Sequence, residues 1–437
     1  MSKVALIKLA KNIKKRLYLI CGNEIPPYIS YTRRINRVKT SARICAMTFD
    51  DGPMKLSPVP SNENSSLTET LLDTLEKHNA KGTFDIIGTT ENNYPDTEGV
   101  IGTPSWSGVK FDHYPSFGKD SFAGAVNCPE LIERILSGGH QLTNHTYSHV
   151  LYGRKNIIYS ERHTLSSFED AREDLLKLDN LIFNEYNYKM NYSRPPHYVD
   201  RIEKGLNTYD LYALENYLYL GASFDGAGWL PCSSYEDEVN AMTEPLEKTL
   251  KNSPNALCGQ IIFQKDGYNM ALRTPVVTGL DKQLDILDYY GYNVVTVGEL
   301  VDKYPFADVD EFDRDFELFK ELLKEYAICY IDNTLKPDTN MSLGELCVLI
   351  APKSETVNKR ISIILNGEKL ASPIPAIHPY SGAISWAIEN NIFDDITRKR
   401  IFSTVTLNDF NNLSEKFNVD LIKSGGFTRR NVLKSIK

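Results

Sequence analysis

The chain has few cysteines, and their spacing excludes two common uses of that residue. Seven cysteines occur among 437 residues, and no two of them form a Cys-x-x-Cys pair. A structural zinc knuckle and a dithiol redox motif are therefore not predicted. The odd number and the wide spacing also argue against a disulfide framework. Cys45 and Cys258 lie near apolar segments that read as strands, so we expect both to be buried thiols.

Long apolar runs are also missing. Six Lys and Arg residues interrupt the apolar residues of the first 21 positions, so neither a signal-peptide core nor a membrane span is predicted there. Residues 1–39 instead read as a basic amphipathic segment. Two interpretations stay open, namely a contact with a membrane surface and a helix that packs its apolar side on the main domain.

An excess of basic residues is absent as well. The net charge is −8, which gives no reason to expect a nucleic-acid partner. The sequence lacks a phosphate-binding P-loop, a nucleophile elbow and a His-Glu-x-x-His motif. Hydrophobic residues make up 41% and charged residues 24%, which is ordinary for a globular chain, and the length predicts two to three domains.

What the chain does contain is a pair of adjacent carboxylates at a predicted strand end. Residues 44–47 read as a short buried strand, which continues to Asp50 and Asp51 before a Gly52-Pro53 turn. Neighbouring side chains leave a strand in opposite directions. One acid could therefore bind a metal ion while the other accepts a proton.

Two histidines follow a glycine-led segment further along the chain. His145 and His149 are four residues apart, so on a helical turn their rings would lie on the same side. Two imidazoles and one carboxylate are typical of a catalytic metal site, because they leave coordination positions open for water and substrate. The alternative is a pair of ordinary surface histidines, although the chain has only eight His in all.

Together these stretches resemble motifs of the polysaccharide deacetylase family, also called the NodB-homology or carbohydrate esterase family four domain. Four further segments continue the resemblance in order, and a segment of about 89–127 reads as an insertion. The four segments are residues 81–88 (Lys-Gly-Thr-Phe-Asp-Ile-Ile-Gly), 193–197 (Ser-Arg-Pro-Pro-His), 223–229 (Ser-Phe-Asp-Gly-Ala-Gly-Trp) and 259–266 (Gly-Gln-Ile-Ile-Phe-Gln-Lys-Asp).

The resemblance implies a metal centre and a general base. Asp51, His145 and His149 match the family's ligands for one divalent ion, zinc or another transition metal. Asp50 matches the base that takes a proton from the attacking water, and Arg194 matches the residue that orients that base. The physics agrees with these roles, since a divalent ion activates water and polarises the amide carbonyl. An Arg beside a buried Asp keeps the acid ionised.

The resemblance also implies residues on the substrate side. Asp225 matches the acid that tunes the family's catalytic histidine, and Trp229 matches a wall of the acetyl pocket. A backbone N–H near Pro196 and His197 could stabilise the oxyanion together with the metal. The family prefers Tyr or Phe at the position of His197, and we favour a packing or sugar-contact role for this histidine.

One departure from the family concerns the general acid. The family's last motif strand ends in Leu-His-Asp or a close variant, whereas this chain has Gln264-Lys265-Asp266. A lysine ordinarily titrates near ~10.4 and releases its proton reluctantly at neutral pH. Three interpretations stay open. Lys265 is the acid with a depressed pKa, another group such as His197 replaces the missing histidine, or the site binds sugar without efficient turnover.

The segments between the motifs alternate between helix-like and strand-like patterns. Amphipathic helices are predicted at residues 66–78, 129–137, 168–183 and 278–290, and a short strand is predicted at residues 293–297. This alternation predicts an α/β fold with a parallel sheet or barrel and helices outside. The family resemblance implies a distorted (β/α) barrel, with the site at the carboxyl ends of the strands.

We therefore expect three parts, namely the basic segment 1–39, a deacetylase-like domain 40–304 and a smaller, mainly helical C-terminal domain 305–437. The last part weakly resembles S-layer homology repeats, on residues 306–309 (Phe-Ala-Asp-Val) and the stretch from Ser342 to Glu345. Such modules bind cell-wall polymers. Ser342 to Glu345 is also an ordinary capping box, so a helical appendage of another role stays open.

These observations predict a metal-dependent hydrolase that removes N- or O-acetyl groups from a polysaccharide or a peptidoglycan-type glycan by attack of an activated water. The alternative is a catalytically weakened glycan-binding cell-wall protein on a deacetylase scaffold, with Lys265 in place of the acid. The resemblance implies a location in the cell envelope, with a cell-wall polymer or a membrane surface as a further partner. Because no signal peptide is visible, a cytoplasmic location stays open.

Overall fold

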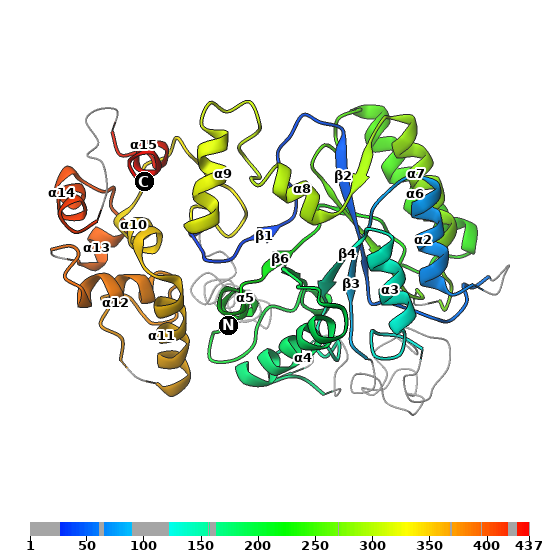
Figure 1. Ribbon diagram of the computed structural model, residues 1–437, viewed down its shortest axis with the longest axis horizontal. Helices are drawn as coiled ribbons and strands as arrows, with labels where there is room; N and C mark the ends of the chain where they lie inside the picture. Colours follow the sequence, from blue (N-terminus) through cyan, green and yellow to red (C-terminus); the bar gives the residue numbers. More distant parts are fainter. Residues whose placement is uncertain are drawn as a thin grey trace, which may run out of the picture.

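The computed structural model describes residues 27–60, 65–89, 122–155, 157, 163–269, 271–367, 369–394, 396–417 and 426–436. The predicted basic helix at the N-terminus and most of the predicted insertion lie outside the described residues. Figure 1 shows a larger body of strands and helices beside a smaller helical part, which runs from α9 (Phe316–Glu325) to α15 (Arg429–Ser435).

A curled parallel sheet forms the centre of the larger body. Its nine strands run in the order β1-β6-β5-β4-β3-β2-β8-β7, with β9 also paired to β2. Among the described residues the sheet stays open between β1 and β7, and the predicted distorted (β/α) barrel is confirmed. The strands are β1 (Arg34–Ile35), β2 (Ile44–Asp50), β3 (Thr83–Ile86), β4 (Gln141–Asn144), β5 (Tyr192–Ser193), β6 (Leu218–Leu220), β7 (Phe224–Asp225), β8 (Ile261–Lys265) and β9 (Asn293–Val295).

Helices cover the outside of this sheet, and the four predicted from periodicity are confirmed to within a few residues. The predicted helix at 278–290 begins three residues earlier, at Pro275, because proline is favoured in the first helical turn. The predicted strand at 293–297 ends at Val295, because Thr296 caps the next helix. The helices are α2 (Leu67–Lys77), α3 (Pro129–Ser137), α4 (Phe168–Tyr186), α5 (Thr208–Glu215), α6 (Tyr235–Asn252), α7 (Pro275–Tyr289) and α8 (Val297–Lys303).

Strand β2 occupies the middle of the sheet and determines where the site forms. Six of its seven residues are buried, which explains the continuous apolar run in place of an alternating pattern. The strand pairs in parallel with β3, β8 and β9. Its last residue, Asp50, lies in register with Asp85 of β3 and with Lys265 of β8. Because parallel strands share one carboxyl edge, these three polar side chains meet there.

The smaller part is helical and has its own apolar core. Segments that precede three of its helices pair with one another, through Met341 N–H to the Phe427 carbonyl and Val405 N–H to the Met341 carbonyl (both 3.0 Å). The predicted capping box at Ser342 is confirmed, whereas the S-layer resemblance stays a prediction. The helices are α9 (Phe316–Glu325), α10 (Leu343–Ile350), α11 (Lys353–Asn366), α12 (Ser381–Glu389), α13 (Arg398–Ile401), α14 (Leu407–Lys416) and α15 (Arg429–Ser435).

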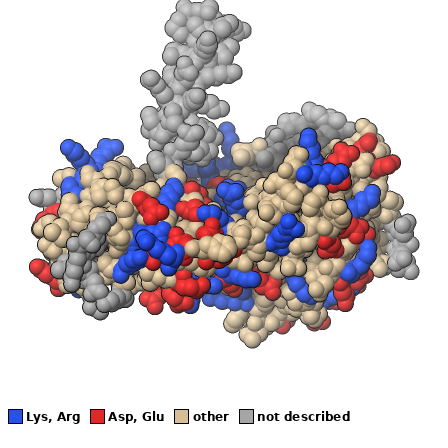
Figure 2. Space-filling model, turned by 90° about the horizontal axis from the view of Figure 1, so that it is seen from above, with Lys and Arg blue, Asp and Glu red and all other residues tan. Residues whose placement is uncertain are grey.

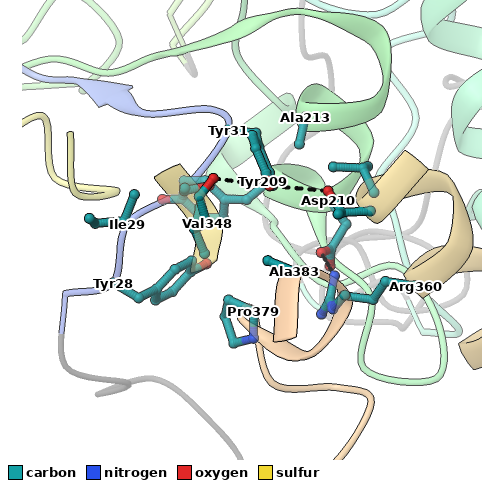
Figure 3. A pocket seen from close by; sticks show the side chains of 14 residues that line it. Tyr28, Ile29, Tyr31, Tyr209, Asp210, Ala213, Val348, Arg360, Pro379 and Ala383 are labelled. Atoms are coloured by element: carbon teal, nitrogen blue, oxygen red, sulfur yellow. Dashed lines mark hydrogen bonds and ion pairs between the residues drawn. The ribbon is translucent and has the colours of Figure 1, made fainter. Parts of the chain in front are cut away.

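Helix α11 joins the smaller part to α5 of the larger body. Val357 on α11 belongs to the main apolar core of the barrel. Arg360 forms an ion pair with Asp210 at the start of α5, and it also donates to the carbonyl oxygens of Ala376 (3.0 Å) and Ile377 (2.8 Å). Figure 3 shows Arg360 and Asp210 pointing toward one another at this junction. The junction thus combines apolar packing with a largely buried ion pair.

The cysteines agree only in part with the expectation from the sequence. The six cysteines in the described part of the chain are free; Cys45 is buried as predicted, but Cys258 is only partly buried, so that part of the prediction is wrong.

Acidic and basic side chains are interspersed over the face that Figure 2 displays. Among the described helices, none is long and apolar enough to cross a membrane.

We propose that the chain divides near residue 305. A chain shortened after Lys303 should fold but should lose about 3–5 kcal/mol of unfolding free energy, because Val357 and Ile361 no longer cover the barrel core. Urea unfolding followed by circular dichroism measures this difference. The full chain with Arg360→Met is the control, since it weakens the same junction without removing the helices. A shortened chain that leaves no protease-resistant core would show one integrated domain instead.

Candidate active site

The end of β2 directs two carboxylates to different places. Asp50 is the last residue of the strand, and Asp51 follows in a left-handed conformation with φ 79°. The next residue must be glycine, because a Cβ atom on Gly52 would lie 2.0 Å from Oδ2 of the buried Asp266. The chain therefore turns sharply at Asp51, and the two adjacent acids acquire different neighbours, as predicted.

The two histidines lie on an irregular loop after β4, so the predicted helical turn is wrong. Thr146 (φ 75°) and His149 (φ 53°) have left-handed backbone conformations that no helix contains. Asn144 and Asp174 hold the loop through hydrogen bonds from three of its backbone N–H groups. The loop still brings both rings together, with 4.9 Å between the ring centres of His145 and His149.

Both imidazoles converge on one carboxylate oxygen. His145 Nε2 and His149 Nε2 each lie 3.1 Å from Asp51 Oδ1, and all three residues are buried. Burial alone would lower the pKa of His145, but Asp85, Asp51 and Asp50 raise it well above its usual range. Burial lowers the pKa of His149 against the opposing effect of Asp51. Two nitrogens and one oxygen gathered at this distance form a donor set that could hold a transition metal.

A buried ion pair lies directly behind this donor set. Arg194 is 1% exposed and forms an ion pair with Asp50. Its remaining donors reach the carbonyl oxygens of Leu220 (3.1 Å) and Gly221 (3.0 Å) and the hydroxyl of Thr48 (3.2 Å). Burial raises the pKa of Asp50 to about 6, although Arg194 lowers it. A carboxylate with this pKa is ionised for most of the time at neutral pH and can still accept a proton.

The predicted acid Lys265 also reaches the donor set. Its Nζ lies 2.8 Å from Asp51 Oδ2, whereas the two histidines contact the other oxygen, Oδ1. His197 is close by, with its ring centre 5.6 Å from that of His149. The crowded surroundings and the neighbouring His149 lower the pKa of His197, although the residue itself is exposed to solvent. An exposed ring at the edge of the donor set is compatible with the contact role that we favour for it.

The remaining predicted residues lie nearer the solvent. Asp225 is exposed at the end of β7 and accepts hydrogen bonds from Ala227 N–H (2.9 Å) and Trp229 Nε1 (3.2 Å). Trp229 is 37% exposed. Pro196 is buried and begins the short 3-10 turn Pro196–Tyr198 that carries His197. The indole, held by its carboxylate partner, thus presents a partly exposed aromatic face of the kind that suits contact with a sugar ring.

One polar residue of the site was missed by the sequence analysis. Asp85 on β3 is 0% exposed and its Oδ2 lies 2.9 Å from His145 Nδ1. The available signal was an acid within an otherwise apolar strand, in the segment Thr83–Ile86. An acid in such a position is uncommon unless it has a partner.

Comparisons with known proteins agree on one family. The family model of polysaccharide deacetylase matches residues 37–212. A peptidoglycan-N-acetylglucosamine deacetylase of Listeria monocytogenes is 26% identical over 195 residues, which are 45% of this chain and 28% of that protein. A peptidoglycan-N-acetylglucosamine deacetylase of Bacillus cereus is 24% identical over 253 residues, which are 58% of this chain and 66% of that protein. This chain thus spans less than two thirds of the length of either relative.

The solved structures give a more distant likeness. The chitin deacetylase of the fungal pathogen Colletotrichum lindemuthianum superposes with a TM-score of 0.41 and 19% sequence identity. The superposition covers 61% of this chain and 90% of that structure.

Removing Arg194 should be far more damaging than removing a surface arginine. Arg194→Met leaves Asp50 without its partner and the Leu220 and Gly221 carbonyls without their donors, so we expect a loss of about 3–5 kcal/mol of unfolding free energy. The matched control is Arg172→Met, which removes a partly buried surface pair with Glu215 and should cost at most about 1 kcal/mol. Urea titration of both variants measures the two losses. Equal losses would mean that the buried pair does not organise the site.

Proposed function

We propose that this chain, in which residues 37–212 form a polysaccharide deacetylase domain, removes acetyl groups from an acetylated cell-wall glycan. The observation that carries the proposal is the convergence of His145 and His149 on Asp51, directly beside a carboxylate paired with arginine. The names of the bacterial relatives favour N-acetylglucosamine of peptidoglycan as the first substrate to test, and a cell-envelope location.

Asp51, His145 and His149 would hold one divalent metal ion, zinc or another transition metal. Such an ion would polarise the acetyl carbonyl and make an attacking water more acidic. The donors suit this role because they are two imidazole nitrogens and one carboxylate oxygen, which leave coordination positions for water and substrate.

Asp50 is proposed as the general base. It lies next to Asp51 in the chain, and Arg194 fixes its position, so the carboxylate can accept a proton from the attacking water without a rearrangement. Lys265, an ammonium group at the same edge, would deliver a proton to the departing nitrogen. The backbone N–H of His197 is assigned to the oxyanion, and the exposed face of Trp229 to the acetyl and sugar contacts.

The contact between Lys265 and Asp51 also favours a second candidate function. An ammonium group 2.8 Å from the carboxylate of the donor set neutralises charge that a metal ion needs. The alternative is therefore a glycan-binding wall protein that retains the deacetylase scaffold but turns over poorly. The two functions differ in acetate release, while both require glycan binding.

The metal assignment has a direct test. After removal of bound metal with a chelator and reloading with zinc, we expect one ion per chain in the wild type and a loss of most of it in His145→Ala and His149→Ala. His140→Gln is the control, because His140 is also buried but accepts a hydrogen bond from Gly82 N–H (3.0 Å) away from the donor set. Elemental analysis gives the ratio. Unchanged zinc in both alanine variants would exclude this donor set.

The role of Lys265 is tested by acetate release across pH. We expect a weak wild-type enzyme whose rate rises toward alkaline pH, because Asp50 and the water lose protons there while an ammonium group keeps its own. Lys265→His should raise the rate at neutral pH, and Lys265→Ala should lower it by about 100-fold or more. Equal rates in all three would remove Lys265 from the reacting centre. Glycan binding without acetate release by wild type or Lys265→His would favour the binding protein.

A further inference from the structure

The buried acid Asp85 has a position that the reaction proposed above does not use. It lies on β3, in register with Asp50 of β2 on one side and with Thr143 of β4 on the other. Two residues after Thr143, the chain reaches His145. Asp85 is therefore placed by the sheet between the proposed base and the loop that carries a proposed metal ligand.

The contacts of Asp85 are divided between its two oxygens. Oδ1 accepts a hydrogen bond from the Thr143 hydroxyl at 2.6 Å. Oδ2 lies 2.9 Å from His145 Nδ1, but among the described residues it accepts no hydrogen bond of good geometry. The Nδ1 atom is also 2.9 Å from the Arg194 carbonyl oxygen, toward which its N–H is directed. The Asp85 carboxylate thus flanks this hydrogen bond and acts on the ring mainly through its charge.

These contacts fix which nitrogen of His145 faces the metal site. The Arg194 carbonyl oxygen, which accepts the hydrogen bond, and the negative charge of Asp85 beside it together keep the proton on Nδ1. The lone pair of Nε2 is then directed to the side of Asp51, where Nε2 lies 3.1 Å from Oδ1. A carboxylate behind a metal-binding imidazole restricts the ring's orientation and makes the other nitrogen a stronger ligand.

We propose that Asp85 is a positioning residue that orients His145 from behind and strengthens the binding of the divalent metal ion at Asp51, His145 and His149. This inference rests on the proposed function, since it assumes the metal site.

The local charge balance supports the same assignment. Around His145 lie three carboxylates, Asp50, Asp51 and Asp85, and two cations, Arg194 and Lys265. When all five are ionised, the group carries one excess negative charge. Without Asp85 that excess disappears, although a divalent ion must enter the same space. The negative charge of Asp85 thus offsets the positive charge of Lys265, which neutralises Asp51.

A purely structural role explains Asp85 less well. Phe84 precedes it in the strand and stacks on Phe49 at 4.9 Å between ring centres, so the strand already has an apolar core to pack against. A buried carboxylate is costly, and a whole buried polar cluster can often be replaced by apolar residues of similar size at no loss of stability. The cost of burying Asp85 is explained if its negative charge orients His145 as a metal ligand.

The test compares metal affinity with stability in the full-length chain. Zinc affinity is measured by competition with a chromophoric chelator in the wild type, Asp85→Asn and Asp85→Leu. We expect both variants to bind zinc about 10–100-fold more weakly. Asp85→Asn keeps an acceptor for the Thr143 hydroxyl, so its unfolding midpoint in urea should stay close to that of the wild type. The absorption bands of the cobalt(II) form should shift in both variants, since they report the ligand geometry.

Two controls separate positioning from other effects. Thr143→Val removes the hydroxyl bound to Asp85 but leaves the contact with His145, and it should retain zinc affinity to within about threefold. Burial raises the pKa of Asp266 to about 7, so the charge control is measured well above pH 7. There Asp266→Asn removes another fully buried carboxylate, which is bound by the Thr68 hydroxyl (2.8 Å), and it should change affinity far less than Asp85→Asn. A loss in Asp266→Asn as large as in Asp85→Asn would reduce the effect to net charge and overturn the proposal.

The outcomes also separate this inference from the function on which it rests. A wild-type chain that binds no zinc or cobalt would refute the metal site itself. A wild-type chain that binds zinc, with both Asp85 variants binding equally well and with unchanged cobalt spectra, would refute the positioning role alone.

Discussion

Arg194 links the parts of the site more than any other residue. Its guanidinium group holds Asp50 at the end of β2 and two carbonyl oxygens at the end of β6, while its own carbonyl oxygen accepts the Nδ1 proton of His145. A single buried residue therefore sets the position of the proposed base and of one proposed ligand. Because the side chain is fully buried, water cannot satisfy the acceptors that its planar guanidinium group reaches. The strands that carry these acceptors must therefore pair in one register.

Much of the fold could be predicted from local patterns. The helices follow from their periodicity and from cap residues such as Ser66 and Thr296. Strand β2 follows from its unbroken apolar run, which is typical of a strand covered on both faces. The short strands β1 and β7 have only two residues each, so they carry no periodicity to detect, and β1 extends the sheet into the segment before residue 40.

The site was predicted in its residue types but not in its backbone. A spacing of four residues indicated a helix between His145 and His149, yet tertiary hydrogen bonds from Asn144 and from Asp174 of α4 hold an irregular loop instead. Asp85 could not be assigned because its partners come from β4 and from the loop after it, which the sequence does not place beside β3. The contact between Arg360 and Asp210 was not predicted for the same reason, since 150 residues separate the pair.

The position of β2 also determines the order in which the strands of the sheet can pair as the chain is synthesised. On one side β2 pairs with β3, which follows soon in the chain. On the other side residues 46–50 can pair only after residues 261–265 of β8 have been synthesised. During synthesis the longest of the described strands thus keeps one unpaired edge until more than half of the chain has emerged. Such an edge is a template for association with other chains, and closing it over so long a loop is slow. The same central strand that gathers the reactive groups is therefore the element by which a nascent chain is most exposed to aggregation.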